Sequence, residues 1–178
     1  MEKLFFARMN SPVGPLLPGV SENGLALLAF GQELPSRLAG QQVSWHESFE
    51  SCATVRQQLE EYFAGQRRRF TMRLDLRGTD FQKRCWNELL RIPYGETRSY
   101  AEIARAVGSR NAYRAVGQAN HRNPVAIIVP CHRVLAGGKA LGGYGGGLPT
   151  KAFLLRLEGA WFHAVPTDDR QQTTLTFN

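Results

Sequence analysis

The spacing of apolar residues changes at one point of this 178-residue chain, the tripeptide Arg77-Gly78-Thr79. Before it, apolar residues form short runs between turn sequences, which is typical of strands; after it, they recur at helical spacing. A chain of this length holds one domain, or one domain with a small companion. We therefore expect an α+β fold, with a small antiparallel-sheet domain at residues 1–77, a mainly helical domain at 78–160 and a tail at 161–178.

The first of these parts contains a hairpin signal, Glu22-Asn23-Gly24, between two apolar runs. Residues 51–64 carry apolar side chains on one helical face and are followed by Gly65, which predicts a helix and its end. Similar apolar runs bounded by turn residues predict the remaining strands. The predicted strands are residues 3–9, 16–20, 25–30, 43–46 and 70–76.

Beyond the boundary, the pattern predicts four helices. Thr79 or Asp80 can cap the first, and Ser99 can cap the second. The predicted helices are residues 81–91, 100–107, 111–119 and 150–158. An apolar run at 125–129 predicts a strand. The seven glycines within residues 137–147 predict a loop with unusual backbone angles, or one that a flat ligand approaches closely.

The net charge of +7 arises from 22 Lys and Arg against 15 Asp and Glu, and it is uneven. From Arg91 to Arg133 there are seven arginines and only two acids, Glu96 and Glu102. A localised basic stretch indicates an anionic partner, most simply nucleic acid. A basic solvated face is the plain alternative.

Two of the predicted helices are short and closely spaced. Residues 99–107 and 111–119 are joined by Gly108-Ser109-Arg110, and Ala104 lies four residues before Gly108, the small-residue spacing of a tight crossing. The second helix bears Arg114. This spacing is that of a helix-turn-helix unit, whose basic residues would contact DNA phosphates. A plain αα-hairpin in a protein core has the same spacing.

The run Pro130-Cys131-His132-Arg133-Val134 places a cysteine after the predicted strand. The thiolate is the nucleophilic form of cysteine, and an unperturbed thiol is only about 3% ionised at pH 7. His132 offers a base, but neighbours in an extended chain point to opposite faces, so a water relay is expected. Glu158 is the nearest downstream acid that could orient the imidazole. A buried structural cysteine is the alternative.

The rest of the sequence indicates no metal site, no cofactor-binding motif and no membrane-spanning segment. The three cysteines, Cys52, Cys85 and Cys131, form no CxxC pair, which indicates free thiols in a reducing compartment. Cysteines and histidines lack zinc-finger spacing, and the glycine-rich loop lacks the ending of a Walker loop. The N-terminal apolar run is too short for a signal peptide, and no stretch approaches about 18 apolar residues. We expect a cytoplasmic protein.

Several segments match a known family. They are Ile92-Pro93-Tyr94-Gly95, Arg114-Ala115-Val116-Gly117, Asn123-Pro124, Pro130-Cys131-His132-Arg133-Val134, Gly142-Gly143-Tyr144 and Glu158-Gly159. On these residues the chain resembles the 6-O-alkylguanine-DNA alkyltransferases, also called methylated-DNA–protein-cysteine methyltransferases. The likeness is strong over residues 78–160 and weaker before them, and it is closest to the bacterial two-domain form.

The resemblance implies a ribonuclease H-like N-terminal domain and a winged-helix-like C-terminal domain with a helix-turn-helix. It implies DNA repair by direct reversal, in which an alkyl group moves irreversibly from O-6 of guanine, or O-4 of thymine, in double-stranded DNA to Cys131. The damaged base is flipped out, because a stacked base cannot present its alkyl carbon to the thiol. The protein is consumed and uses no cofactor. We expect a monomer; cooperative binding to DNA stays open.

The resemblance also assigns catalytic roles. Cys131 is the acceptor, His132 takes its proton through a water, and Glu158 orients His132. Tyr100 rotates the phosphate and donates a proton to the departing guanine, and Asn123 is a hinge between the recognition helix and the active-site strand.

The implied binding residues form two groups. Arg114 enters the base stack. The other DNA contacts are Tyr113, Ala112, Ser99 and Arg110, and the guanine pocket is lined by Val134, Tyr144, Gly145 and Gly142. Three positions depart from the family pattern. Tyr113 stands where a small residue is usual, Gly145 lacks a side chain that some members use, and the His that often precedes the acid is missing before Glu158.

Two other functions fit part of the pattern. A damage-sensing or regulatory helix-turn-helix protein would bind DNA without transfer, but sensors lack an acceptor cysteine at the position of Cys131. A cysteine hydrolase would need a spatial Cys–His pair, which adjacent residues disfavour.

Overall fold

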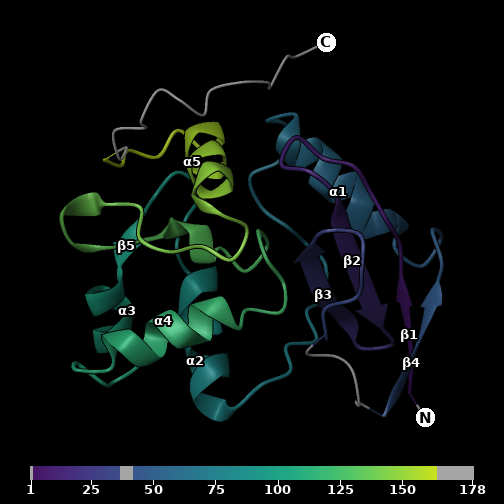
Figure 1. The fold of residues 1–178 in the computed structure, drawn as a ribbon, viewed down its shortest axis with the longest axis horizontal. Coiled ribbons are helices and arrows are strands. Elements are labelled where there is room, and N and C mark those ends of the chain that lie inside the picture. The colour runs from purple at the N-terminus through teal and green to yellow at the C-terminus, as the bar shows by residue number, and fades with distance from the viewer. Residues whose placement is uncertain (1, 37–41, 164–178) are drawn as a thin grey trace.

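The computed structural model describes residues 2–36 and 42–163, so the predicted tail beyond residue 163 lies outside the described residues. A sheet unit and a helical unit lie side by side (Figure 1). The sheet unit comprises β1 (Glu2–Phe6), β2 (Leu16–Ser21), β3 (Gly24–Phe30), β4 (Val43–Glu47) and helix α1 (Ala53–Phe63). The α+β class expected from the sequence is confirmed.

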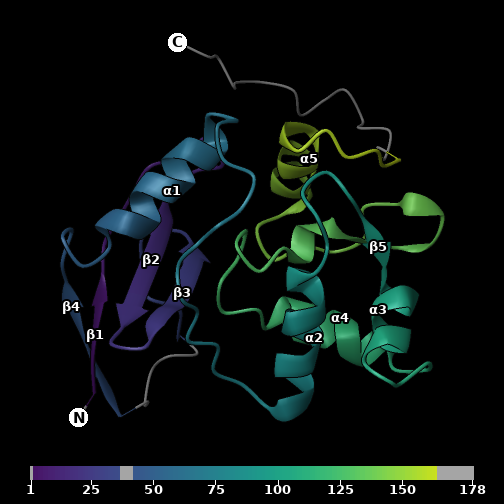
Figure 2. The same cartoon turned by 180° about the vertical axis from the view of Figure 1, so that it is seen from behind.

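The sheet has the strand order β3-β2-β1-β4. The expected antiparallel arrangement holds for β1, β2 and β3, whereas β4 runs parallel to β1. Parallel neighbours need a long connection, and between β1 and β4 the chain passes through β2 and β3. Helix α1 covers one face of the sheet, as the two opposite views show (Figures 1 and 2).

Residues 70–76 do not form the predicted strand. The segment bonds to β3 at one point, where Leu25 donates its N–H to Arg73 O and accepts from Asp75 N–H, each over 2.9 Å. This makes a single parallel bridge between Leu25 and Leu74. The apolar residues of the segment still pack against the core. The apolar alternation of this segment therefore correctly indicated that its side chains are buried. It did not indicate a strand, because the segment is buried without forming a ladder of backbone hydrogen bonds.

The helical unit comprises α2 (Asp80–Leu90), α3 (Tyr100–Ala106), α4 (Tyr113–His121) and α5 (Leu148–Leu157). Short strands β5 (Arg98–Ser99) and β6 (Val134–Leu135) pair in parallel, and two 3-10 turns, η2 (Cys131–Arg133) and η3 (Gly137–Lys139), flank β6. Thr79 and Ser99 each complete a capping box at the start of α2 and α3. The four predicted helices are confirmed.

The turn between α3 and α4 begins at Gly108, whose φ of +80° is left-handed. Gly108 donates its N–H to Arg105 O (3.0 Å) and Ser109 donates to Ala104 O (2.9 Å), the two bonds of a Schellman motif. No atom lies within 4 Å of the place where a Gly108 Cβ would stand. Glycine is therefore needed here for its backbone angle, and not for the close helix crossing that the spacing suggested.

The apolar run at 125–129 is a compact turn and not the predicted strand. It meets β3 at one residue, where Leu28 donates its N–H to Pro124 O (2.9 Å) and accepts from Ala126 N–H (3.0 Å). Ile127 then adopts a left-handed φ of +69°, which is strained for a β-branched residue. The chain thus reverses on its way to Cys131.

A shared hydrophobic core joins the two units. It contains Leu28 of β3, Tyr62 of α1, Trp86 of α2 and Val116 of α4. Separating the units would expose this apolar surface, which opposes independent movement. None of the helices in the described part of the chain has the length and apolar character needed to cross a membrane.

Candidate active site and DNA-binding surface

Cys131 is the first residue of η2 and is only 8% exposed. Its Sγ accepts a hydrogen bond from Asn123 Nδ2 over 3.2 Å. The same amide donates to Val129 O (2.8 Å), and its Oδ1 accepts from Val125 N–H (2.9 Å). Asn123 therefore ties the segment after α4 to the turn that carries the thiol.

His132 is fully buried, and its Nε2 lies 2.8 Å from Glu158 Oε1. A carboxylate oxygen only accepts, so Nε2 carries the hydrogen and Nδ1 carries the free lone pair. Nδ1 is buried without a hydrogen-bond partner among the described residues. The imidazole is thus oriented with its basic nitrogen unoccupied, as a general base requires.

Glu158 is the centre of a buried polar cluster. Its carboxylate accepts from Tyr62 Oη (2.7 Å) and from Arg133 Nε (2.8 Å) and Nη2 (2.9 Å), in addition to His132. Burial alone would raise the pKa of Glu158, but the hydrogen bonds and charges of His132 and Arg133 outweigh it and lower that pKa. The carboxylate is therefore ionised, and every hydrogen bond to it is charge-assisted.

The ionisation of Cys131 and His132 is set by burial. Burial raises the pKa of the Cys131 thiol, and the Asn123 hydrogen bond offsets this only in part. Burial lowers the pKa of His132, against the opposing effect of Glu158. At neutral pH the resting pair is a thiol and a neutral imidazole, so the nucleophile is formed only when its proton is removed.

Tyr144, Gly142 and Gly145 lie on the glycine-rich loop. The Tyr144 hydroxyl is buried and has no hydrogen-bond partner among the described residues. Burial, followed by the charges of Cys131 and Glu158, raises the pKa of this hydroxyl. A Cβ on Gly142 would lie 3.5 Å from Tyr100 Cε2, so the loop passes close to the start of α3. Gly145 is exposed, with open space around it.

Lys151 of α5 holds this loop to the rest of the site. Its fully buried ammonium donates to Val134 O (2.6 Å), to Leu141 O and to Gly143 O (3.4 Å). Burial lowers the pKa of Lys151 to about 8. The Val134 side chain is buried, and its carbonyl is already engaged by Lys151.

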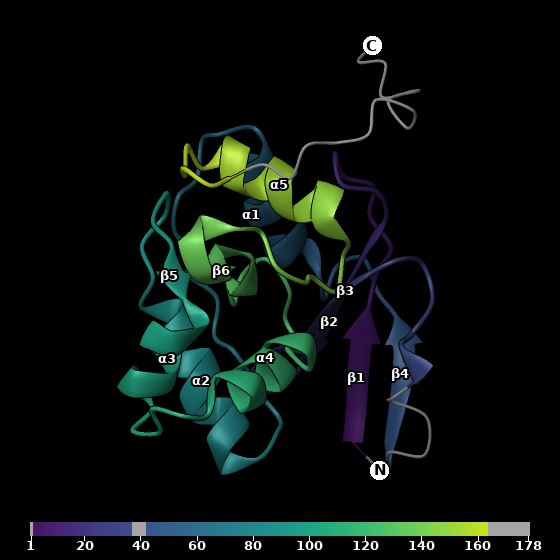
Figure 3. The same cartoon turned by 60° about the vertical axis from the view of Figure 1, so that its left-hand side comes forward.

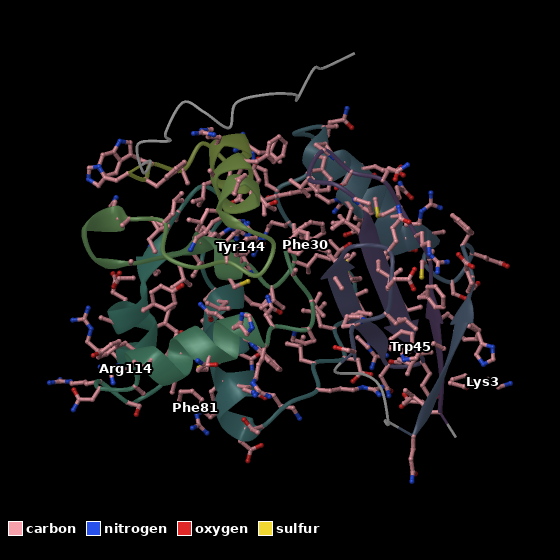
Figure 4. All side chains as sticks on the ribbon, in the orientation of Figure 1. Lys3, Phe30, Trp45, Phe81, Arg114 and Tyr144 are labelled. Carbon is pink, nitrogen blue, oxygen red and sulfur yellow. The ribbon has the colours of Figure 1, made fainter. Side chains whose placement is uncertain are left out.

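The proposed DNA contacts lie on the outer edge of the helical unit. Arg114 lies at this edge (Figure 4). Arg114 and Tyr113 are both exposed at the start of α4, with the Arg114 guanidinium 5.8 Å from the centroid of the Tyr113 ring. Arg110 is exposed in the preceding turn, and Ala112 is half-buried at the helix start. Ser99 differs, because its hydroxyl already accepts from Glu102 N–H (3.2 Å) as a cap. Helices α2, α3 and α4 lie together in the view turned by 60° (Figure 3).

Three residues of this site were missed by sequence reasoning. Tyr62, in the helix predicted at residues 51–64, and Lys151 were both assigned no role in the site. Arg133 was counted in the basic stretch, but it is 7% exposed and paired with Glu158, so it adds nothing to the surface charge. Among the described residues, no three metal-ligating side chains lie together.

Known proteins are similar to this chain over nearly all of its length. Residues 4–76 match the ribonuclease-like domain, and residues 80–160 the DNA-binding domain, of 6-O-methylguanine DNA methyltransferase. The methylated-DNA–protein-cysteine methyltransferase of Methanosarcina acetivorans is 47% identical over 162 residues, covering 88% of this chain and 99% of that protein.

Solved structures of a mycobacterial protein are also similar. The O6-methylguanine methyltransferase of Mycobacterium tuberculosis is 46% identical, with a TM-score of 0.78 and coverage of 88% of this chain and 93% of that one. The same organism's OGT in complex with DNA is 44% identical, with a TM-score of 0.76 and coverage of 87% and 92%. These likenesses in sequence and fold, over both parts of the chain, place this protein in the 6-O-methylguanine DNA methyltransferase family.

Proposed function

We propose that the protein repairs alkylated DNA by moving the alkyl group from O-6 of guanine to the sulfur of its own Cys131. Family membership makes the chain a methylated-DNA–protein-cysteine methyltransferase that acts on DNA. The setting of Cys131 carries the assignment of the acceptor: its nearly buried thiol is held by Asn123 next to the oriented His132–Glu158 pair. A DNA-binding protein that only senses damage would need no such nucleophile.

In the proposed reaction, a bond forms between Cys131 Sγ and the alkyl carbon while the bond from that carbon to O-6 breaks. The electron pair of the broken bond stays on the guanine. His132 Nδ1 takes the thiol proton through a bridging water, and Glu158 stabilises the resulting imidazolium. The Tyr100 hydroxyl, whose ring lies close to the glycine-rich loop at Gly142, supplies a proton to the departing guanine. The proton taken by His132 then returns through water to Tyr100.

Binding to DNA is proposed to occur through the exposed start of α4. Cations on this edge would contact phosphates and give a salt-dependent affinity. Arg114 would take the place of the flipped guanine in the stack, with Tyr113 beside it. The flipped base would enter the pocket formed by Tyr144, Gly142, Gly145 and Val134.

The product would be a thioether on Cys131. A histidine, a carboxylate and two tyrosines do not cleave a carbon–sulfur bond, so each molecule would react once. We also propose a monomer that works in the cytoplasm, where a reducing environment keeps Cys131 a free thiol. Residues 1–77 would act as a supporting domain and residues 78–160 as the reactive one.

A titration tests the proposed stoichiometry. Increasing amounts of a duplex with labelled 6-O-methylguanine are added to the protein, and the label bound to protein is measured. We expect a plateau at one methyl group per molecule, with no further transfer on a second addition. Cys85→Ser, which removes another buried free thiol, should reach the same plateau. Repeated turnover, or label that never reaches the protein, would contradict the proposal.

A further inference from the structure

Strand β3 of the sheet unit reaches the glycine-rich loop of the pocket. Its last residue, Phe30, lies with its ring centroid 5.8 Å from that of Tyr144, at an interplanar angle of 71°. The two side chains face each other where the two units meet (Figure 4). An edge-to-face pair of this kind is stabilising beyond the area that it buries.

The Phe30 ring also lies against the loop backbone two residues further on. A Cβ placed on Gly146 would lie 2.7 Å from Phe30 Cε2 and 2.8 Å from Cζ, distances that real Cβ atoms do not show. The ring therefore contacts the loop at both Tyr144 and Gly146. It limits how far the loop can move toward the sheet.

Phe30 is itself held in place by the sheet. It pairs with Leu16 of β2, and the next residue, Gly31, donates its N–H to Pro15 O (2.9 Å). Two residues earlier, Leu28 bonds to the segment that follows Asn123. One strand of the sheet unit thus fixes both the segment that holds the thiol and the loop that faces it.

Tyr144 also packs against the hydrophobic cluster that contains Cys131. Its hydroxyl is buried without a hydrogen-bond partner among the described residues. In the proposed function Tyr144 lines the guanine pocket, and Phe30 supports it from the sheet unit. An alkyl group too large for this pocket has to displace Tyr144. The Phe30 ring opposes a displacement of Tyr144 toward the sheet unit.

We infer that Phe30 is a positioning residue that sets the size of the alkyl group accepted beside Cys131. The inference rests on the proposed transfer to Cys131. With Phe30 in place, a small alkyl carbon is held in line with Sγ, whereas a bulky group must displace the loop. Without the ring, the loop gains room, so small groups are held less well and large ones enter more easily.

The test compares two adducts in the same duplex, 6-O-methylguanine and 6-O-benzylguanine, under single-turnover conditions. In Phe30→Ala, the ratio of benzyl to methyl rate constants should rise about fivefold or more over the unchanged protein, the size of effect expected for one lost aromatic pair. Phe30→Leu should give a smaller rise and covers the case in which the alanine variant does not fold. Phe49→Ala, at a 53% exposed phenylalanine that follows β4, should leave the ratio unchanged.

A second pair of variants tests the contact itself. Gly146→Ala should slow methyl transfer, because its Cβ meets the Phe30 ring. In the Phe30→Ala background the same substitution should cost much less, because the space is free. This non-additivity is the signature of a direct contact.

The inference is overturned if both Phe30 variants slow the two adducts equally, if the ratio falls, or if the Gly146 effect is the same in both backgrounds. An unchanged protein that transfers no alkyl group to Cys131 would overturn the proposed function, and this inference with it. If the alkyl group is transferred to Cys131 but the ratio of benzyl to methyl rate constants is the same in the Phe30 variants and the unchanged protein, only the role of Phe30 is overturned.

Discussion

The sheet unit and the helical unit contribute to the site in different ways. Every group proposed to touch DNA or the alkyl carbon belongs to the helical unit. The sheet unit supplies supports instead: the Tyr62 hydroxyl on Glu158, the Phe30 ring on the glycine-rich loop, and the backbone of β3 on the segment after Asn123. Reactive groups thus lie on one unit, and their placement depends on packing against the other.

The buried polar cluster around Glu158 shows most clearly that the two units contribute different kinds of groups. Glu158 receives charge compensation from Arg133 of its own unit and a hydrogen bond from the uncharged Tyr62 hydroxyl of the other. Substitutions of the buried carboxylate, of the exposed edge proposed to bind DNA and of the supporting sheet unit should therefore differ in the size of their effects. They should also differ in whether they impair stability or alkyl transfer.

The largest effect on stability is expected from Glu158→Gln. It leaves the buried Arg133 guanidinium without a charge partner, and breaking a buried pair in this way costs about 3–5 kcal/mol. Urea unfolding measures the loss. Glu96→Gln, which removes an exposed partner of Arg98, should change the unfolding free energy very little. A small loss for both variants would contradict the central place of Glu158.

The same variant should alter the dependence of stability on pH. The pKa of Glu158 in the folded protein lies below its ordinary value of 4.5, so the unfolded chain binds more protons as the pH falls. Its stabilising contribution is full above about pH 4.5 and is lost on acidification below it. The unfolding free energy of the unchanged protein should fall more steeply there than that of Glu158→Gln. Parallel curves would show that the carboxylate pKa is not depressed.

A functional loss without a loss of stability is expected from Arg114→Ala. Repair of a methylated duplex should slow by about tenfold or more, while reaction with free 6-O-benzylguanine stays the same, because only the duplex must be opened. Arg8→Ala, at an exposed arginine of the sheet unit, serves as the control. Equal losses on both substrates would remove the proposed role of Arg114 in the stack.

The smallest effect is expected from Tyr62→Phe, which removes only a hydroxyl from the sheet unit. Losing one hydrogen bond to a charged group should reduce the unfolding free energy by about 1–2 kcal/mol and slow methyl transfer a few-fold. Thermal or urea unfolding and single-turnover rates measure the two effects. Tyr113→Phe, at an exposed tyrosine, should change the stability by less. If Tyr62→Phe matches it, the sheet unit does not support Glu158.

Local signals in the sequence were enough to predict the helices. Ser99 was expected as a cap and is one, and of the two candidates Thr79 and Asp80 it is Thr79 that caps the other helix; capping could be predicted because it depends on residues three positions apart. The runs at 70–76 and 125–129 were predicted as strands and are not, because an apolar pattern reports burial and not the partner of each backbone group.

Contacts between the two units could not be predicted from spacing. Tyr62 and Glu158 are 96 positions apart. Nothing near Tyr62 in the sequence indicates that its hydroxyl donates a hydrogen bond to a buried carboxylate. Arg133 looked like surface charge because its partner is 25 positions away. The proposed reactive residues Cys131 and His132 could be named in advance because a short, specific run carries them, and Asn123 and Glu158 could be named from the resemblance; the residues of the sheet unit that support them could not.

The most direct test of the account is the mass of the peptide that contains Cys131 after reaction with a duplex carrying 6-O-methylguanine. The account predicts that this peptide gains the mass of one methyl group, while the peptides with Cys52 and Cys85 stay unchanged. A methyl group on either of those cysteines, or an unchanged mass at Cys131 with excess substrate, would contradict it.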